Sequence, residues 1–121
     1  MQFEILTIFP GYFRSPLSES LLGKAIAAGL VEVAVTDLRD FAPDRHRKVD
    51  DEAYGGGPGM VLQVPVVAAA IEARRGSPPA WTVFLTPDGR RLDQAKLVEL
   101  SRREARLAAQ AVASRPALRL F

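Results

Sequence analysis

The sequence predicts an α/β domain with a mainly parallel sheet and helices on both of its faces. Short runs rich in β-branched and aromatic residues alternate along the chain with segments of helical periodicity, and Pro or Gly marks most of the changes. The 121 residues are 48% hydrophobic and 25% charged, which is typical of one soluble globular domain. Because strands that alternate with helices form βαβ units, we expect parallel strands covered on both faces.

Three elements are predicted in the first part of the chain. "FEILTIF", residues 3–9, is apolar and β-branched and is stopped by a Pro-Gly pair, as expected of a buried strand. Ser15 is a good N-cap for a helix whose leucines repeat at helical spacing and which ends at Gly29. "LVEVAVTDL", residues 30–38, is rich in Val and predicts the second strand, followed by a long charged loop.

The second part of the chain repeats this alternation. "PVVAAAIEARR", residues 65–75, has helical composition with Pro in the first turn and Gly directly after it. "AWTVFLT", residues 80–86, predicts a third strand, and "TPDG", residues 86–89, predicts a turn. Asp93 is a good N-cap for a further helix.

Charge and composition exclude several classes of function. The sequence pI is about 9.4, but residues 1–100 carry 11 Lys/Arg and 13 Asp/Glu, and residues 101–121 carry five Arg and one Glu. The basicity therefore belongs to the C-terminal part and does not indicate that the main body binds a polyanion. With no Cys and one His, we expect no disulfides and no metal site. An acidic residue and an early Pro in the first ten residues argue against a signal peptide or membrane span, which favours a cytoplasmic protein.

The sequence "YGGGPGM", residues 54–60, concentrates four glycines in one place. They either shape a loop whose N–H groups face an anion or form a mobile turn. A nucleotide-binding P-loop is disfavoured, because Met-Val follows the last glycine where that motif has Lys and Ser/Thr. Four glycines cost on the order of 0.5–1 kcal/mol each in chain entropy, so we favour a shaped functional loop. The glycines are Gly55, Gly56, Gly57 and Gly59.

The preceding stretch, "DRHRKVDD", alternates acidic and basic residues. Its arginines either bind phosphates or pair with Asp44, Asp50 and Asp51, and its histidine can donate or accept a hydrogen bond. Composition alone favours a solvated, self-paired loop. Tyr54, directly after this stretch, either stacks on a base or packs against the protein. The candidate residues are Asp44, Arg45, His46, Arg47, Asp50 and Asp51.

Taken together, three segments resemble the N-terminal half of the bacterial tRNA (guanine-N1)-methyltransferases of the TrmD type. They are "ILTIFPGYF", "RDFAPDRHRKVDDEAYGGGPGMVL" and "VFLTPDGRRLDQ", in this order. The resemblance implies a domain of the SPOUT class, with a trefoil knot that is incomplete in these residues, and a homodimer. It also implies methyl transfer from S-adenosylmethionine to N1 of the guanosine immediately 3′ of the anticodon of tRNA, with no metal.

The resemblance assigns positions to residues rather than individual catalytic roles. Leu85, Thr86 and Pro87 match the strand end whose backbone lines the family's cofactor pocket. The residues from Asp44 to Asp51 named above, Tyr54 and the four glycines match a signature segment beside the active site and tRNA. The family's general base lies in segments that these 121 residues do not contain.

Beyond about residue 105 the match ends. "RREARLAAQAVASRPALRLF" reads as an Ala/Arg-rich helical run broken at Arg115-Pro116. We therefore divide the chain into a partial methyltransferase domain, residues 1–104, and a divergent tail, residues 105–121. A second hypothesis is an inactive fragment that acts at most as an RNA-binding or dimerising module.

Overall fold

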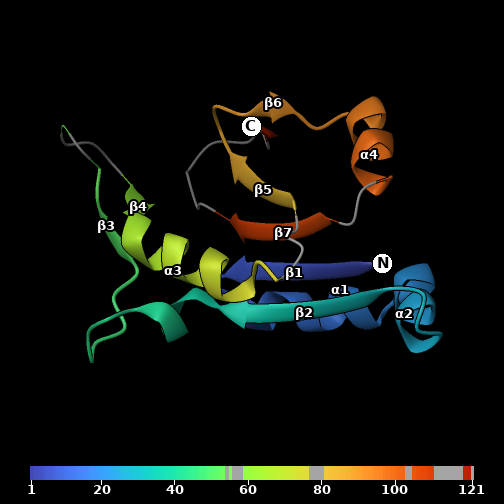
Figure 1. Ribbon diagram of the computed structural model, residues 1–121, viewed down its shortest axis with the longest axis horizontal. Coiled ribbons are helices and arrows are strands. Elements are labelled where there is room, and N and C mark those ends of the chain that lie inside the picture. Colours follow the sequence, from blue (N-terminus) through green and yellow to red (C-terminus); the bar gives the residue numbers. More distant parts are fainter. Residues whose placement is uncertain (54, 56–58, 77–80, 103–104, 111–118, 121) are drawn as a thin grey trace.

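The chain forms an α/β structure whose central strands run in the same direction (Figure 1). The computed structural model describes residues 1–53, 55, 59–76, 81–102, 105–110 and 119–120. Strand β1, Gln2–Thr7, pairs in parallel with β2, Glu32–Asp37, over the full length of both. Both are shorter than predicted, and short 3-10 helices come after them: η1, Pro10–Phe13, and η2, Leu38–Phe41.

A second group of strands lies beside the first. Strand β5, Trp81–Thr86, pairs in parallel with β7, Ala105–Gln110. On its other side β5 pairs antiparallel with β8, Arg119–Leu120, which in turn pairs with β6, Arg90–Arg91. Strand β7 runs alongside β1 and points the same way (Figure 1). In space the strands follow the order β2, β1, β7 and β5, but they belong to two hydrogen-bonded sheets, β1-β2 and β6-β8-β5-β7. The parallel pairs β1–β2 and β5–β7 confirm the predicted α/β fold with parallel strands.

Strand β7 corrects the prediction for the start of the tail. Residues 105–110, "ARLAAQ", were expected to be helical because Ala, Arg, Leu and Gln are strong helix formers. The structure places them in a strand, because the backbone edge of β5 offers a hydrogen-bonded ladder that outweighs the local preference. The proposed division at residue 104 stays a prediction.

The helix predicted from Ser15 to Gly29 is two helices. Helix α1, Arg14–Ser18, ends where Glu19 adopts an extended conformation, with φ −99° and ψ 153°, and α2, Ser20–Ala27, begins directly after it. Ser15 lies inside α1 and is not its N-cap. Gly29 follows α2 with φ +70° and donates its N–H to the Ile26 carbonyl at 2.9 Å, which confirms the predicted stop.

The two remaining helices confirm their predicted signals. Helix α3, Val64–Arg74, has Pro65 in its first turn and is followed by Gly76 with φ +69°. Helix α4, Gln94–Ser101, is capped by Asp93, whose side chain accepts a hydrogen bond from the Lys96 N–H at 2.8 Å.

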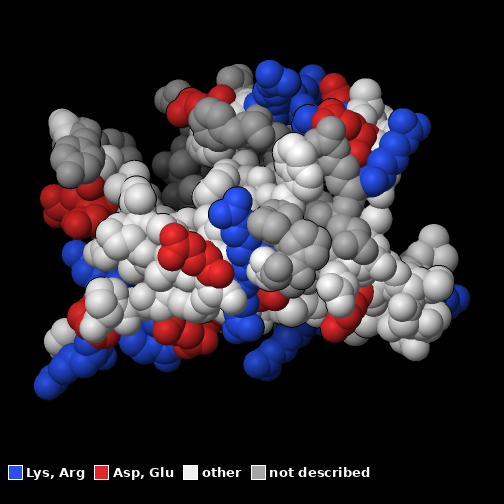
Figure 2. Space-filling view, viewed as in Figure 1, with Lys and Arg blue, Asp and Glu red and all other residues white. Residues whose placement is uncertain are grey.

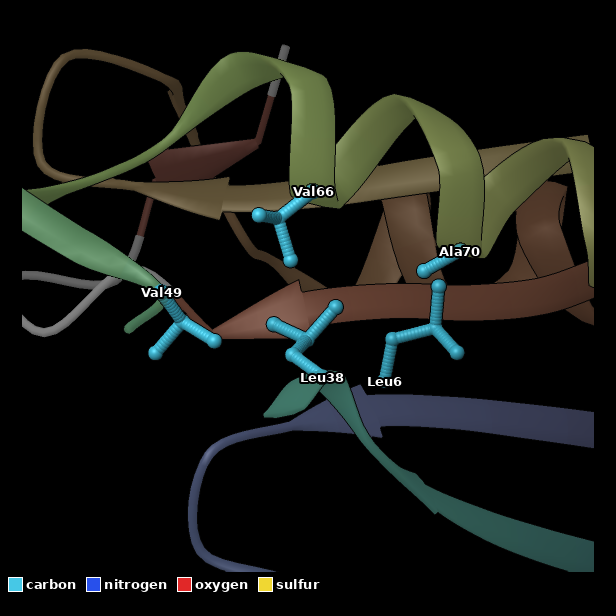
Figure 3. Packing of buried hydrophobic residues seen from close by; sticks show 5 residues of the cluster. All are labelled: Leu6, Leu38, Val49, Val66 and Ala70. Atoms are coloured by element: carbon cyan, nitrogen blue, oxygen red, sulfur yellow. The ribbon is translucent and has the colours of Figure 1, made fainter. Parts of the chain in front are cut away.

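Helices cover both faces of the first pair of strands, with α3 on one face and α1 on the other, and α2 lies at the end where β1 and β2 begin (Figure 1). Under α3 lies the principal apolar cluster, which joins the helix to β1, to η2 and to the loop beyond η2 (Figure 3). Its buried members are Leu6, Leu38, Val49, Val66 and Ala70. The same loop leads into an unpredicted antiparallel hairpin of β3, Asp50–Glu52, and β4, Met60–Leu62.

Candidate functional site

Two predicted site segments leave the sheet at the carboxyl ends of parallel strands. The charged loop follows β2 by way of η2, and the "TPDG" turn follows β5. The arrowheads of β1, β2, β5 and β7 all point toward the side of the molecule that carries the β3–β4 hairpin (Figure 1). This is the edge where open α/β sheets bind their ligands.

The candidate cofactor segment ends β5 and enters a closed turn. Leu85, Thr86 and Pro87 are half-buried. The Gly89 N–H donates to the Thr86 carbonyl and the Asp88 N–H donates to Thr86 Oγ1, both at 3.2 Å. These two bonds confirm the predicted turn. The hydroxyl oxygen of Thr86 stabilises the turn as a hydrogen-bond acceptor.

The backbone of Leu85 is paired on both sides. It lies opposite Gln110 of β7 and opposite Leu120 of β8, and Thr86 lies opposite Arg119. The last residues of β5 therefore form an inner strand of their sheet, and a ligand approaches this segment from the turn or from a face of the sheet.

Asp44 builds the turn that carries the signature residues. One of its carboxylate oxygens accepts the His46 N–H at 2.7 Å and faces the Lys48 N–H at 3.5 Å, while its carbonyl accepts the Arg47 N–H at 3.1 Å. This is the local side-chain-to-backbone bonding by which Asp stabilises turns. Asp44 is therefore engaged in shaping the loop.

Arg47 is held in place by its backbone and its side chain. It has φ +54°, a left-handed conformation that a non-glycine residue rarely adopts. Its guanidinium pairs with the Asp40 carboxylate, and its Nε donates to the Arg39 carbonyl at 3.3 Å. The prediction allowed Arg47 to pair with a carboxylate, but not with this one, which lies seven residues earlier.

Lys48 and Asp51 form a further exposed pair, with 3.5 Å between Nζ and Oδ1. Asp50 begins β3 opposite Leu62, and its carbonyl accepts the Gln63 side-chain amide at 3.3 Å. Both aspartates thus lie on the first strand of the hairpin, which the neighbouring Val49 anchors in the core.

Arg45 and His46 differ from these neighbours. Both side chains are exposed, and within the described part of the chain neither makes a hydrogen bond or ion pair; only the backbone N–H of His46 is engaged. Figure 2 shows basic side chains projecting where Figure 1 places the loop between η2 and β3. These two residues form the solvent-facing tip of the turn.

The glycine cluster is described at two of its four positions. Gly55 has φ +88° and Gly59 has φ +122°, and a Cβ added to either would meet no atom within 4 Å. The glycines are needed there for backbone conformation rather than for close packing. Tyr54, Gly56 and Gly57 lie outside the described residues, so the anion-binding role of the loop stays a prediction.

A polar cluster that the sequence did not predict joins Glu4, Thr36 and Arg74. Glu4 of β1 is buried, accepts a hydrogen bond from the Thr36 hydroxyl of β2 and lies 3.8 Å from the guanidinium Nε of Arg74 on α3. The signal available in the sequence was a single carboxylate inside an otherwise apolar strand. The cluster ties the strand pair to the helix above it.

The described residues contain no group of three or more His, Asp or Glu side chains arranged to hold a metal ion. Among the same residues, no helix combines the length and the apolar character needed to cross a membrane.

Comparison with known proteins decides the family. The family model described as "tRNA (Guanine-1)-methyltransferase TrmD" matches residues 1–110. The chain belongs to this family. The match continues six residues past the boundary drawn from the sequence and includes the whole of β7.

Individual relatives agree. The tRNA (guanine-N(1)-)-methyltransferase of Geotalea uraniireducens is 51% identical over 106 residues, covering 87% of this chain and 43% of that protein. The protein of the same name from Geobacter sulfurreducens is 49% identical over 102 residues, covering 84% and 42% respectively. The chain therefore spans less than half the length of these curated relatives.

A solved structure confirms the fold. The tRNA (m1G37) methyltransferase from Aquifex aeolicus superposes with a TM-score of 0.77 and 34% identity, covering 89% of this chain and 50% of that one. The predicted α/β fold of the SPOUT class is thereby confirmed.

Proposed function

We propose that this chain forms the N-terminal half of the site of a tRNA (guanine-N1)-methyltransferase. The reaction moves a methyl group from S-adenosylmethionine to N1 of the guanosine immediately 3′ of the anticodon. The observation that carries the proposal is that, in a chain of this family, the turn after β5 and the signature turn both leave the carboxyl edge of the sheet. A tRNA substrate agrees with a cytoplasmic location.

The residues at the end of β5 fit the uncharged part of the methyl donor. Leu85 and Pro87 offer half-buried apolar surface, and no charged side chain lies among residues 85–87. Ligand sites are mostly apolar with a few polar groups, and a purine ring suits such a surface. When bound, S-adenosylmethionine supplies an electrophilic methyl group on a sulfonium.

The reaction needs more than these residues supply. N1 of guanine carries a proton at neutral pH, so a base must remove it and a donor must stabilise negative charge at O6. We assign neither role to a residue of this chain and place the general base in the remaining half of the family's domain. The residues described here bind and position the two substrates.

A second copy of the chain is the expected protein partner. Several large apolar side chains of the N-terminal part are exposed, among them Tyr12 at 72% and Leu21 at 79%. Exposed apolar surface of this kind favours association. The proposed assembly is a homodimer.

A second candidate function is that of a non-catalytic module that binds RNA or dimerises. The observation that favours it is the length, since the chain covers 43% of its Geotalea relative. Of the two candidates, only the methyltransferase predicts that the purified chain binds S-adenosylmethionine.

Isothermal titration calorimetry with S-adenosylmethionine separates the two candidates. We expect measurable binding that Pro87→Ala weakens and that Pro16→Ala, the same change on exposed α1, leaves intact. Transfer of labelled methyl to a tRNA transcript, with a control transcript that has adenosine at the target position, then tests the reaction. Absence of both binding and transfer would favour the non-catalytic module.

A further inference from the structure

The signature turn contains two arginines that lie two residues apart and have opposite surroundings. The Arg47 guanidinium is engaged by the Asp40 carboxylate and the Arg39 carbonyl. The Arg45 guanidinium is exposed and, within the part of the chain that the structure describes, has no partner. Both arginines lie in the same mixed-charge stretch of the sequence, so the difference between their surroundings comes from the fold of the turn.

Among the described residues, no carboxylate near the tip forms an ion pair with the Arg45 guanidinium. The Asp44 carboxylate accepts backbone N–H groups of the turn, and the Asp40 and Asp51 carboxylates pair with Arg47 and Lys48. A guanidinium at such a position presents its five donors to solvent, and its fork matches the geometry of a phosphate.

The backbone of Arg47 explains how the tip is presented. A left-handed non-glycine residue costs roughly 1–2 kcal/mol and persists only where its surroundings impose it. Here the N–H of Arg47 donates to the Asp44 carbonyl at 3.1 Å and its side chain is fixed on η2. The turn is thus closed behind the tip, which directs the Arg45 and His46 side chains outward.

We propose that Arg45 contacts an RNA phosphate and that Arg47 is a positioning residue, which holds the turn so that Arg45 meets the RNA. The identity of the RNA as tRNA rests on the proposed function. The contact itself rests on the unpaired guanidinium and on the pinned turn behind it.

Salt dependence tests the contact. Each Lys or Arg that neutralises a phosphate adds about 0.7–0.9 to the slope of log affinity against log salt. We expect Arg45→Ala to lower the slope by this amount for a tRNA transcript with guanosine 3′ of the anticodon. Between about 50 and 200 mM salt, the unchanged chain then loses about threefold more affinity than the variant.

Lys24→Ala is the matched control, because it also removes one exposed positive charge. Lys24 lies on α2, at the end of the molecule away from the β3–β4 hairpin (Figure 1). We expect its slope to equal that of the unchanged chain. An equal reduction in both variants would indicate a general charge effect and overturn the proposal.

Arg47→Gly tests the positioning role, since Gly adopts the left-handed conformation without strain but lacks the guanidinium. The loosened turn must then become ordered on the RNA before Arg45 makes its contact, so we expect weaker RNA binding with an unchanged salt slope. The double variant Arg45→Ala/Arg47→Gly should bind no more weakly than Arg45→Ala, because Arg47 acts through Arg45. A slope reduced by Arg47→Gly itself, or additive losses, would overturn this role.

The outcomes separate this inference from the proposed function. If RNA binding follows the expected slopes but S-adenosylmethionine does not bind, the contact stands and the methyltransferase proposal falls. If the cofactor binds and Arg45→Ala leaves the slope unchanged, the contact alone is overturned. Failure of the unchanged chain to retain the transcript at about 50 mM salt also overturns the contact.

Discussion

Replacement of Gly23 by Ala sets two effects of opposite sign against each other. Ala is about 1 kcal/mol more favourable than Gly inside a helix, so propensity alone predicts stabilisation of α2. A Cβ on residue 23, however, would lie 2.3 Å from the Ser18 carbonyl oxygen and 2.6 Å from its carbon. Both atoms belong to the backbone of α1, so no side-chain rotation relieves the contact.

The clash outweighs the gain. Ordinary contact at a Cβ begins near 3.4 Å, so α1 and α2 must separate by about 1 Å. Overpacking of this kind costs about 1–3 kcal/mol, and since backbone lies on both sides we expect the upper part of that range. The net loss of unfolding free energy is then about 2 kcal/mol, or about 8 °C in Tm for a chain of this length.

Urea unfolding followed by circular dichroism measures this loss. We expect a lower urea concentration at the midpoint and an unchanged dependence of the unfolding free energy on urea concentration. Gly11→Ala is the control, because a Cβ there would meet nothing within 4 Å, and we expect a change of at most about 0.5 kcal/mol. A Gly23→Ala variant as stable as the unchanged chain, or more stable, would refute the close approach of the two helices.

Three further substitutions test the fold by the same unfolding measurement. Leu38→Ala removes a side chain with 0% exposure and should cost about 2–5 kcal/mol, whereas Leu30→Ala, at 68% exposure, should change little; equal effects would place Leu38 outside the core. Asp93→Ala should lower the free energy of unfolding by about 1 kcal/mol, because it removes the N-cap of α4, whereas Asp93→Ser should retain most of that stability. Equal losses in the two variants would argue against a capping role for Asp93. Gly29→Ala forces φ +70° on a residue with a Cβ and should cost about 1 kcal/mol, with Gly29→Asn in between; a stabilised alanine variant would argue against the left-handed stop.

The sequence predicted the structure correctly where neighbouring residues determine the backbone conformation. Asp93 caps the helix that follows it, and Gly29 ends the helix before it, because capping geometry involves only neighbouring residues. The strands β1, β2 and β5 were likewise recognisable as short apolar runs, and the parallel pairing of β1 with β2 follows from the helices between them.

The sequence-based predictions were wrong where contacts with residues distant in the sequence determine the local structure. Nothing local breaks the helical pattern at Glu19, where α1 ends and α2 turns back onto it. Residues 105–110 favour a helix in isolation and form a strand because β5 offers an unpaired edge. Composition allowed several carboxylates for Arg47, and the choice of Asp40 depends on η2, which the sequence did not indicate.

The signature turn shows how a highly charged loop acquires a defined shape. Leu38 and Val49, on either side of the turn at residues 44–48, are both buried in the cluster under α3 (Figure 3). Leu38 ends a predicted strand, but Val49 is a single apolar residue between Lys48 and Asp50 and lacks the periodicity by which a core residue is recognised. Because both ends of the loop are anchored in the core, its freedom is restricted before any ion pair forms, and weak exposed pairs such as Arg47 with Asp40 then suffice to select one conformation. Loss of either anchor should therefore weaken RNA binding as well as stability, without lowering the salt slope that reports the Arg45 contact.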